Sequence, residues 1–139
     1  MDDASSSPDD GPDSISFAGD LTHQTIGAFY EVYNTLHFGL MESVYAGAMN
    51  VELLARNIPV EREPLLRVYY KGHVVGAYRA DLIVDGRLIL ELKSMAKVGH
   101  REKRQLLHYL CATNIRVGLV LNFGPQSAEF LRVVNSEGV

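Results

Sequence analysis

The sequence is poor in cysteine and contains no long apolar run. Cys111 is the single cysteine among 139 residues, so neither an intramolecular disulfide nor a cysteine-based zinc site can form. No stretch of 18 or more uncharged apolar residues is present, and the first residues are acidic, which argues against a membrane span and a secretory signal peptide. We therefore expect a cytoplasmic protein with no membrane partner.

Several familiar site motifs are also missing. The glycines do not fall between a strand and a helix in the spacing of a P-loop or of a dinucleotide-binding turn. The histidines show no metal-ligand spacing such as HExxH, and we interpret them as structural or surface residues: His23, His37, His73, His100 and His108. These absences exclude the commonest nucleotide-binding sites and the histidine-based zinc hydrolases.

Negative charge is concentrated in the first twenty residues. This stretch has no lysine or arginine and carries six of the acidic residues: Asp2, Asp3, Asp9, Asp10, Asp13 and Asp20. It is rich in Ser, Asp, Gly and Pro, so we predict a disordered acidic tail over residues 1–20 and one domain over residues 21–139. The remainder has 13 basic residues against 17 − 6 = 11 acidic ones, a charge of about +2.

Apolar spacing predicts a single α/β domain with a mixed sheet flanked by helices. At 47% hydrophobic and 22% charged residues, the composition favours a folded globular protein. Helices are expected from Thr22 to residue 36, from about 40 to 56 and from 100 to 113; on the second, an apolar side is formed by Leu40, Val44, Ala48 and Val51. Strands are expected at 61–70, 74–84, 88–94, 115–122 and 128–134. The predicted order is α-α-β-β-β-α-β-β.

Two carboxylates lie in adjacent predicted strands, and most residues next to them in the sequence are apolar. Asp81 lies in the centre of an otherwise apolar segment, and Glu91 and Lys93 alternate with leucines on the following strand. A two-residue turn at Asp85-Gly86 would pair Asp81 with Leu90 and send the two carboxylates to opposite faces. A three-residue turn would instead pair Ile83 with Arg87 and Asp81 with Ile89, leaving the carboxylates as diagonal neighbours on one face.

We predict the second arrangement. Carboxylates that close would repel one another unless a cation lay between them, so the pair indicates a divalent metal site.

The residues Asp81, Glu91 and Lys93 resemble the metal-binding motif of the PD-(D/E)XK nuclease superfamily. Residues 39–45, Gly-Leu-Met-Glu-Ser-Val-Tyr, resemble the signature of its GxxExxY family, and Gln105 with Tyr109 resembles the QxxxY motif of its exonuclease-like branch. The strand from Gly118 to Gly124 is also typical of this family. The resemblance departs at residues 37–39, where His-Phe-Gly replaces Gly-Pro-Gly, and at Ala80, which precedes the first Asp in place of Pro.

The resemblance implies a restriction-endonuclease-like core and a metal-dependent nuclease that hydrolyses phosphodiester bonds of DNA or RNA, with QxxxY favouring an exonuclease. It implies Mg²⁺ or Mn²⁺ held by Asp81, Glu91 and the Leu92 backbone carbonyl, with Glu42 joining from the second helix. Lys93 would align the attacking water or neutralise charge. Gln105 and Tyr109 would hold the nucleic-acid strand or that water, with Tyr45 beside Glu42 as a nucleic-acid contact.

A basic segment adjoins these residues. Between residues 93 and 104 only Glu102 is acidic, and the expected phosphate-binding side chains are Lys97, Arg101, Lys103 and Arg104. The small size of the domain also suggests a homo-oligomer. The alternative function is a non-catalytic nucleic-acid-binding or assembly module that keeps the nuclease-like fold.

Each candidate also has a structural interpretation. The charged strand residues suit a solvated sheet face, and Glu42 suits the first turn of a helix. Tyr45 is equally well a core aromatic, Gln105 and Tyr109 suit surface and packing positions, and the basic segment suits a solvated helix start. Cys111 is expected to be a small buried residue.

Overall fold

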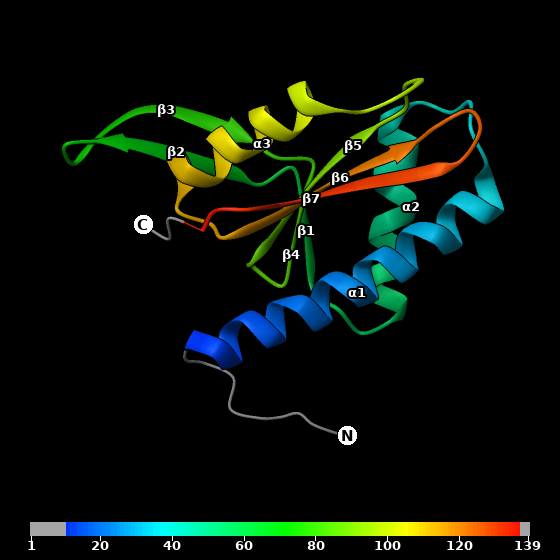
Figure 1. Cartoon of the computed structure of the whole chain (residues 1–139), viewed down its shortest axis with the longest axis horizontal. Coiled ribbons are helices and arrows are strands. Elements are labelled where there is room, and N and C mark those ends of the chain that lie inside the picture. Colours follow the sequence, from blue (N-terminus) through cyan, green and yellow to red (C-terminus); the bar gives the residue numbers. More distant parts are fainter. Residues whose placement is uncertain (1–10, 137–139) are drawn as a thin grey trace.

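A five-stranded mixed sheet with helices on both faces forms the centre of the computed structural model (Figure 1). The structure describes residues 11–136, and side chains from residue 19 onward. The helices are α1 (Gly11–Leu36), α2 (Glu42–Ala55) and α3 (His100–Thr113). The strands are β1 (Val60–Arg62), β2 (Leu65–Tyr70), β3 (His73–Arg79), β4 (Leu82–Val84), β5 (Leu88–Lys93), β6 (Val117–Phe123) and β7 (Ala128–Val134). The predicted element order is confirmed, with the first two predicted strands each divided in two.

Strand β5 is at the centre of the sheet, whose order is β1-β4-β5-β6-β7. It pairs antiparallel with β4 and parallel with β6. Its leucines, Leu88, Leu90 and Leu92, pack in the core cluster that contains residues of α1 and α2, whereas Ile89 packs in the cluster that contains Leu106 of α3. Successive side chains of a strand point to opposite faces, so Glu91 and Lys93 share the α3 face with Ile89, as predicted.

Three aromatic rings anchor the helices α1 and α2 to the end of β6. The Phe29 ring meets the Phe123 ring edge to face with centroids 5.0 Å apart, and the Tyr45 ring stacks on Phe123 at 4.0 Å. All three side chains are fully buried. Aromatic pairs of this kind add to the stabilisation from buried area, so Phe123 joins both helices to the sheet.

A sharp bend divides one long hairpin between two sheets. Strands β1 and β4 pair within the main sheet, and β2 and β3 form a separate two-stranded sheet. The bend lies where the Glu63 N–H bonds the Asp81 carbonyl at 2.9 Å and the Ala80 N–H bonds the Pro64 carbonyl at 3.3 Å. As a result, the hairpin β2–β3 packs beside α3 and extends beyond it (Figure 1).

The turn between β4 and β5 has the predicted parity but a different register. Val84 pairs with Leu88 and Ile83 with Ile89, so the three-residue turn comprises residues 85–87. The predicted pairing of Ile83 with Arg87 is therefore wrong: the partner of Ile83 is Ile89, two residues further along the chain. Asp85 and Gly86 both have positive φ, which lets the turn close at this position. Continued by one residue, the observed register brings Asp81 opposite Glu91, a closer relation than the predicted diagonal.

Three further expectations are corrected. Helix α1 begins at Gly11, ahead of the predicted domain start, so residues 11–20 of the predicted tail are helical, while residues 1–10 lie outside the described residues. The side of α2 that carries Val44 and Val51 is exposed, because Tyr45, Met49 and Leu53 form its buried side. Cys111 is exposed rather than buried. Among the described residues, no helix is both long and apolar enough to cross a bilayer.

Replacing Phe123 with alanine should lower the free energy of unfolding by about 3–5 kcal/mol, because the change opens a cavity between two helices and the sheet. The measurement is chemical denaturation followed by circular dichroism. Phe130→Ala is the matched control: Phe130 lies on the neighbouring strand β7 and is 37% exposed, so its loss should cost about 1 kcal/mol or less. Equal losses in the two variants would contradict the anchoring role of Phe123.

Candidate active site at the end of strand β5

Asp81 is held against the end of β5. Its Oδ2 atom accepts a hydrogen bond from the backbone N–H of Leu92 at 2.7 Å. Glu91 and Lys93 flank Leu92 on the α3 face of the strand. Burial raises the pKa of Asp81 and of Glu91, and the Lys93 ammonium lies close enough to both carboxyls to offset part of that increase. The structure thus brings together the three residues of the predicted Asp, Glu and Lys motif.

Glu42 reaches the same place from the first turn of α2. Its Oε2 atom accepts a hydrogen bond from the backbone N–H of Ser94, the residue that follows β5, at 3.2 Å. The turn before α2 contains Gly39 at φ 120°, a conformation that side chains strongly disfavour, so glycine is needed there. The Tyr45 hydroxyl then fixes this turn by donating to the His37 carbonyl and accepting from the Leu40 N–H.

Tyr45 is not a nucleic-acid contact. Its side chain is 0% exposed and stacks on Phe123 in the core, so no strand can reach it. The alternative interpretation, a core aromatic, is the correct one. Its hydroxyl is what links the core to the turn that positions Glu42.

Tyr78 is a member of this site that the sequence analysis missed. Its hydroxyl donates a hydrogen bond to Oε2 of Glu91, and its ring stacks on Tyr109 with centroids 3.7 Å apart and an interplanar angle of 7°. Tyr109 therefore touches the site through Tyr78, while Gln105, one turn earlier on α3, is exposed. No sequence motif marks Tyr78, because the bend at Ala80 is what folds β3 over Glu91.

Burial changes the acidity of the two strand carboxyls. It raises the pKa of Glu91 to about 7, against the opposing effects of the Lys93 ammonium and the Asp81 backbone N–H. It also raises the pKa of Asp81, partly offset by the Leu92 N–H. The Glu42 carboxylate raises the pKa of both groups further, which places all three negative charges in one neighbourhood.

The donor set suits a hard divalent cation, but it is not closed around one. Asp81, Glu91 and Glu42 offer only oxygen ligands, and a cation would offset their mutual repulsion. Among the side chains that the structure describes, those of residues 19–136, however, no three from His, Cys, Asp or Glu form a group that could hold a metal ion. In this conformation protein donors occupy the carboxylates: the Tyr78 hydroxyl on Glu91 and backbone N–H groups on the other two.

A buried amide supports the loop that follows Lys93. Asn122 is fully buried on β6, where its Oδ1 accepts from the Met95 N–H at 3.0 Å and its Nδ2 donates to the Met95 carbonyl at 3.0 Å. Such a two-sided bond fixes the loop residue rigidly, and the loop includes Ser94, the partner of Glu42. Asn122 is thus a positioning residue that the sequence analysis noted only as part of a typical strand.

The basic segment is available to solvent. Exposed side chains extend from the loop after β5 into the first turns of α3: Lys97, Arg101, Lys103 and Arg104. Helix α3 begins after Gly99, whose N–H bonds the Glu102 carboxylate at 2.9 Å. His100 and His108 are exposed on the same helix and form no metal group with other described residues. The segment lies next to Lys93 in the chain, as the expected phosphate-binding role requires.

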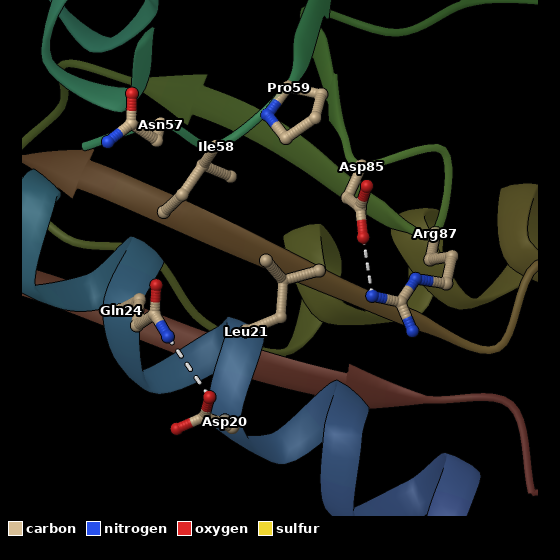
Figure 2. Close-up of a pocket in the computed structure, with 8 residues that line it drawn as sticks. All are labelled: Asp20, Leu21, Gln24, Asn57, Ile58, Pro59, Asp85 and Arg87. Carbon is tan, nitrogen blue, oxygen red and sulfur yellow. Dashed lines mark hydrogen bonds and ion pairs between the residues drawn. The ribbon is translucent and has the colours of Figure 1, made fainter. Parts of the chain in front are cut away.

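A separate pocket lies at the opposite end of β5. Figure 2 shows it between residues 20–24, inside α1, and the turn before β5, with Asp85 paired to Arg87 at 2.5 Å and Gln24 bonded to Asp20 at 3.0 Å. None of the predicted site residues lines it. The candidate active site is therefore an arrangement of side chains at the sheet end rather than this pocket.

Replacing Glu91 with glutamine should make the protein more stable relative to the wild type as pH rises. The folded pKa of about 7 exceeds the ordinary value of 4.5, so burial of Glu91 costs nothing below pH 4.5 and increasingly destabilises the fold as pH rises through 7. The measurement is urea denaturation in the presence of a chelator, from pH 4.5 to 8.5. The difference in free energy of unfolding between the variant and the wild type should change by up to about 3 kcal/mol over this range.

Glu61→Gln is the control, because Glu61 is exposed on β1 and its variant should show a difference that stays constant with pH. A constant difference for Glu91→Gln as well would contradict the buried environment of Glu91.

Comparisons with known proteins assign this chain to a family. A family model described as the PD-(D/E)XK nuclease superfamily matches residues 19–133. The crystal structure of SSO0001 is similar, with a TM-score of 0.47 and 22% sequence identity over 66% of this chain and 48% of that one, so the chain spans about half the length of that protein. None of the curated proteins matches. Since the family model covers most of its 139 residues, the chain belongs to the PD-(D/E)XK nuclease superfamily.

Proposed function

We propose that this protein is a metal-dependent nuclease of the GxxExxY type that hydrolyses phosphodiester bonds in DNA or RNA. The observation that carries the proposal is the meeting of Asp81, Glu91 and Glu42 with Lys93 at the end of β5. Two partly buried carboxyls, Asp81 and Glu91, close to the exposed Glu42 carboxylate are costly for stability. That cost is understandable at a site whose charges act on a ligand.

Asp81, Glu91 and the Leu92 carbonyl are the groups that would hold Mg²⁺ or Mn²⁺, and Glu42 would join them from α2. When bound, such a cation supplies Lewis-acid chemistry, activating water and offsetting the charge that develops on the phosphate. Because the Tyr78 hydroxyl donates to Glu91, metal binding requires this carboxylate to present an oxygen that Tyr78 does not use. A cation binds these carboxyls only in their ionised form. Because the pKa values of Asp81 and Glu91 are raised, metal binding should weaken as the pH falls.

The other residues act on the substrate. Lys93 orients the attacking water or stabilises charge on the scissile phosphate, as an ammonium does effectively in a partly buried site. Gln105 and Tyr109 lie one turn apart on the α3 face beside Tyr78, where they hold the strand or the water. The exposed basic side chains of the 93–104 segment bind backbone phosphates on either side of the scissile bond.

Cleavage assays with paired variants test the proposal. End-labelled and circular DNA and RNA are incubated in Mg²⁺, Mn²⁺ or chelator with wild type, Glu91→Gln and Glu42→Gln. We expect metal-dependent cleavage that falls on the order of 100-fold or more in both variants, because each removes a negative charge from the metal site. Sparing of circular substrates would support exonuclease action.

Glu52→Gln provides the matched control for Glu42→Gln, because Glu52 lies on the same helix but pairs with Arg56 at the surface at 2.8 Å. Its loss should leave cleavage unchanged, since an exposed pair contributes little. Retained binding without cleavage in any metal would overturn the nuclease proposal and favour the non-catalytic binding module.

The homo-oligomer expected from size finds support on α2. Met41, Val44 and Val51 are exposed apolar side chains at spacings of three and seven residues along its outer side, and Val51 is 68% exposed, whereas Ala48 between them packs partly against the core. An apolar stripe of this period with no lysine or arginine in the helix suits packing against the same helix of a second copy.

Val51→Glu should convert an oligomer to monomer, because two glutamates would be buried face to face. Light scattering after size exclusion measures the mass. Ala112→Glu, on the exposed side of α3, adds the same charge elsewhere and should leave the mass unchanged. A monomeric wild type at micromolar concentration would exclude the oligomer.

A further inference from the structure

The β2–β3 hairpin is a basic segment that the proposed chemistry does not use. Residues 64–80 contain no aspartate or glutamate, in a chain whose formal net charge is −4. They carry three permanent cations, Arg67, Lys71 and Arg79, together with His73 near the tip. All four side chains are exposed, and none of them is in an ion pair with another residue of the described chain; Arg79, at the base of the hairpin, donates a hydrogen bond to the Glu63 carbonyl at 3.0 Å. A polyanion is the partner that this charge pattern favours.

Two tyrosines project from the same hairpin. Tyr69 is 60% exposed and Tyr70 is 61% exposed, whereas Tyr78 on the same sheet is buried against α3. The register explains the difference: Leu66 and Tyr78 form a pair that faces α3, and beyond the bulge at Val68 the hairpin continues past that helix. Large aromatic rings left in water at a projecting tip have no packing role in the described chain.

Cation and ring lie together at the tip. Tyr69 and Tyr70 are consecutive in β2, so they project from opposite faces of the hairpin. On one face the Lys71 ammonium is 5.4 Å from the centre of the Tyr70 ring, and on the other Arg67 precedes Tyr69 by two residues. Exposed aromatic rings interleaved with cations are what single-stranded nucleic acid requires: bases stack on the rings, and the cations neutralise the phosphates. A duplex would hide the base faces and leave the rings unused.

The hairpin also leads directly to the candidate active site. Strand β3 passes from His73 at the tip to Tyr78, whose hydroxyl bonds Glu91, and Asp81 follows three residues later. Five residues of strand span about 17 Å at about 3.3 Å each.

We propose that the β2–β3 hairpin is an arm that binds single-stranded nucleic acid around its tip, through Tyr69 on one face and Tyr70 on the other. This proposal rests on the proposed nuclease function, because that function is what directs the bound nucleic-acid strand from the hairpin tip to the candidate active site. It adds to that function a single-stranded substrate and a binding element outside the catalytic residues.

Binding in chelator tests the arm without cleavage. Fluorescence anisotropy with labelled 20-nucleotide single strands of DNA and RNA compares the wild type with the double variant Tyr69→Ala, Tyr70→Ala. We expect affinity to fall about tenfold for each ring removed. Tyr30→Ala is the control, because Tyr30 is an exposed tyrosine on α1, and it should bind as the wild type does. Thermal melting shows whether the double variant keeps its fold.

A second variant keeps the test decisive if the double variant unfolds. Lys71→Gln should reduce the slope of log affinity against log salt concentration by about one, as expected for the loss of one phosphate contact. Equal affinity of wild type and folded double variant would overturn the arm, and so would a wild type that binds duplex as tightly as single strands, or that binds no nucleic acid.

The two proposals fail separately. A wild type that binds single strands through the tyrosines but cleaves nothing leaves the arm standing and overturns the nuclease. A wild type that cleaves in metal but binds independently of Tyr69 and Tyr70 overturns the arm alone.

Discussion

The pairing of β4 with β5 determines whether this protein has a site at all. Asp81 and Glu91 belong to different strands, and a shift of one residue in their register would place the two carboxylates on opposite faces of the sheet. The turn over residues 85–87 fixes that register because Asp85 and Gly86 adopt positive φ and Val84 pairs with Leu88. The bond from the Leu92 N–H to Asp81 depends on this alignment, whereas Glu42 reaches Ser94 independently of it, from α2.

The bend between the two sheets is the second feature on which the site depends. By turning at Pro64 and Ala80, the chain leaves the main sheet and brings β3 across Glu91, where Tyr78 covers the carboxylate. Covering removes water from Glu91 and raises its pKa, so the same bend that buries the site also tunes it. It also sends the rest of the hairpin outward, with its tyrosines in solvent. One local deviation from a straight hairpin thus serves both the carboxylates and the projecting arm.

The sequence predicted the order of the elements and the shared face of Asp81 and Glu91, because alternation within a strand and the length of a turn are local properties. It failed where two apolar patterns competed. Helix α2 has apolar residues on two sides, and only tertiary packing decides that Tyr45 is buried and Val51 exposed. Tyr78 and Asn122 escaped notice for a different reason: each acts on a segment distant in sequence, and neither stands in a recognisable spacing.

The buried position of the carboxylates makes structural sense only in relation to a ligand. Without a cation, Glu42 opposes the ionisation of both Asp81 and Glu91, and the single ammonium of Lys93 does not offset three acidic groups. The fold reduces that conflict by giving every carboxylate at least one protein donor: backbone N–H groups for Asp81 and Glu42, and both the Tyr78 hydroxyl and the Asp81 backbone N–H for Glu91. The backbone donors are fixed by the strand end, the bend and the loop, whereas the Tyr78 hydroxyl is the one side-chain donor among those described. Because Tyr78 is buried and stacked on Tyr109, its hydroxyl holds one oxygen of Glu91 in place, which leaves the other oxygen for a further partner and connects Glu91 to the face of α3 that carries Gln105.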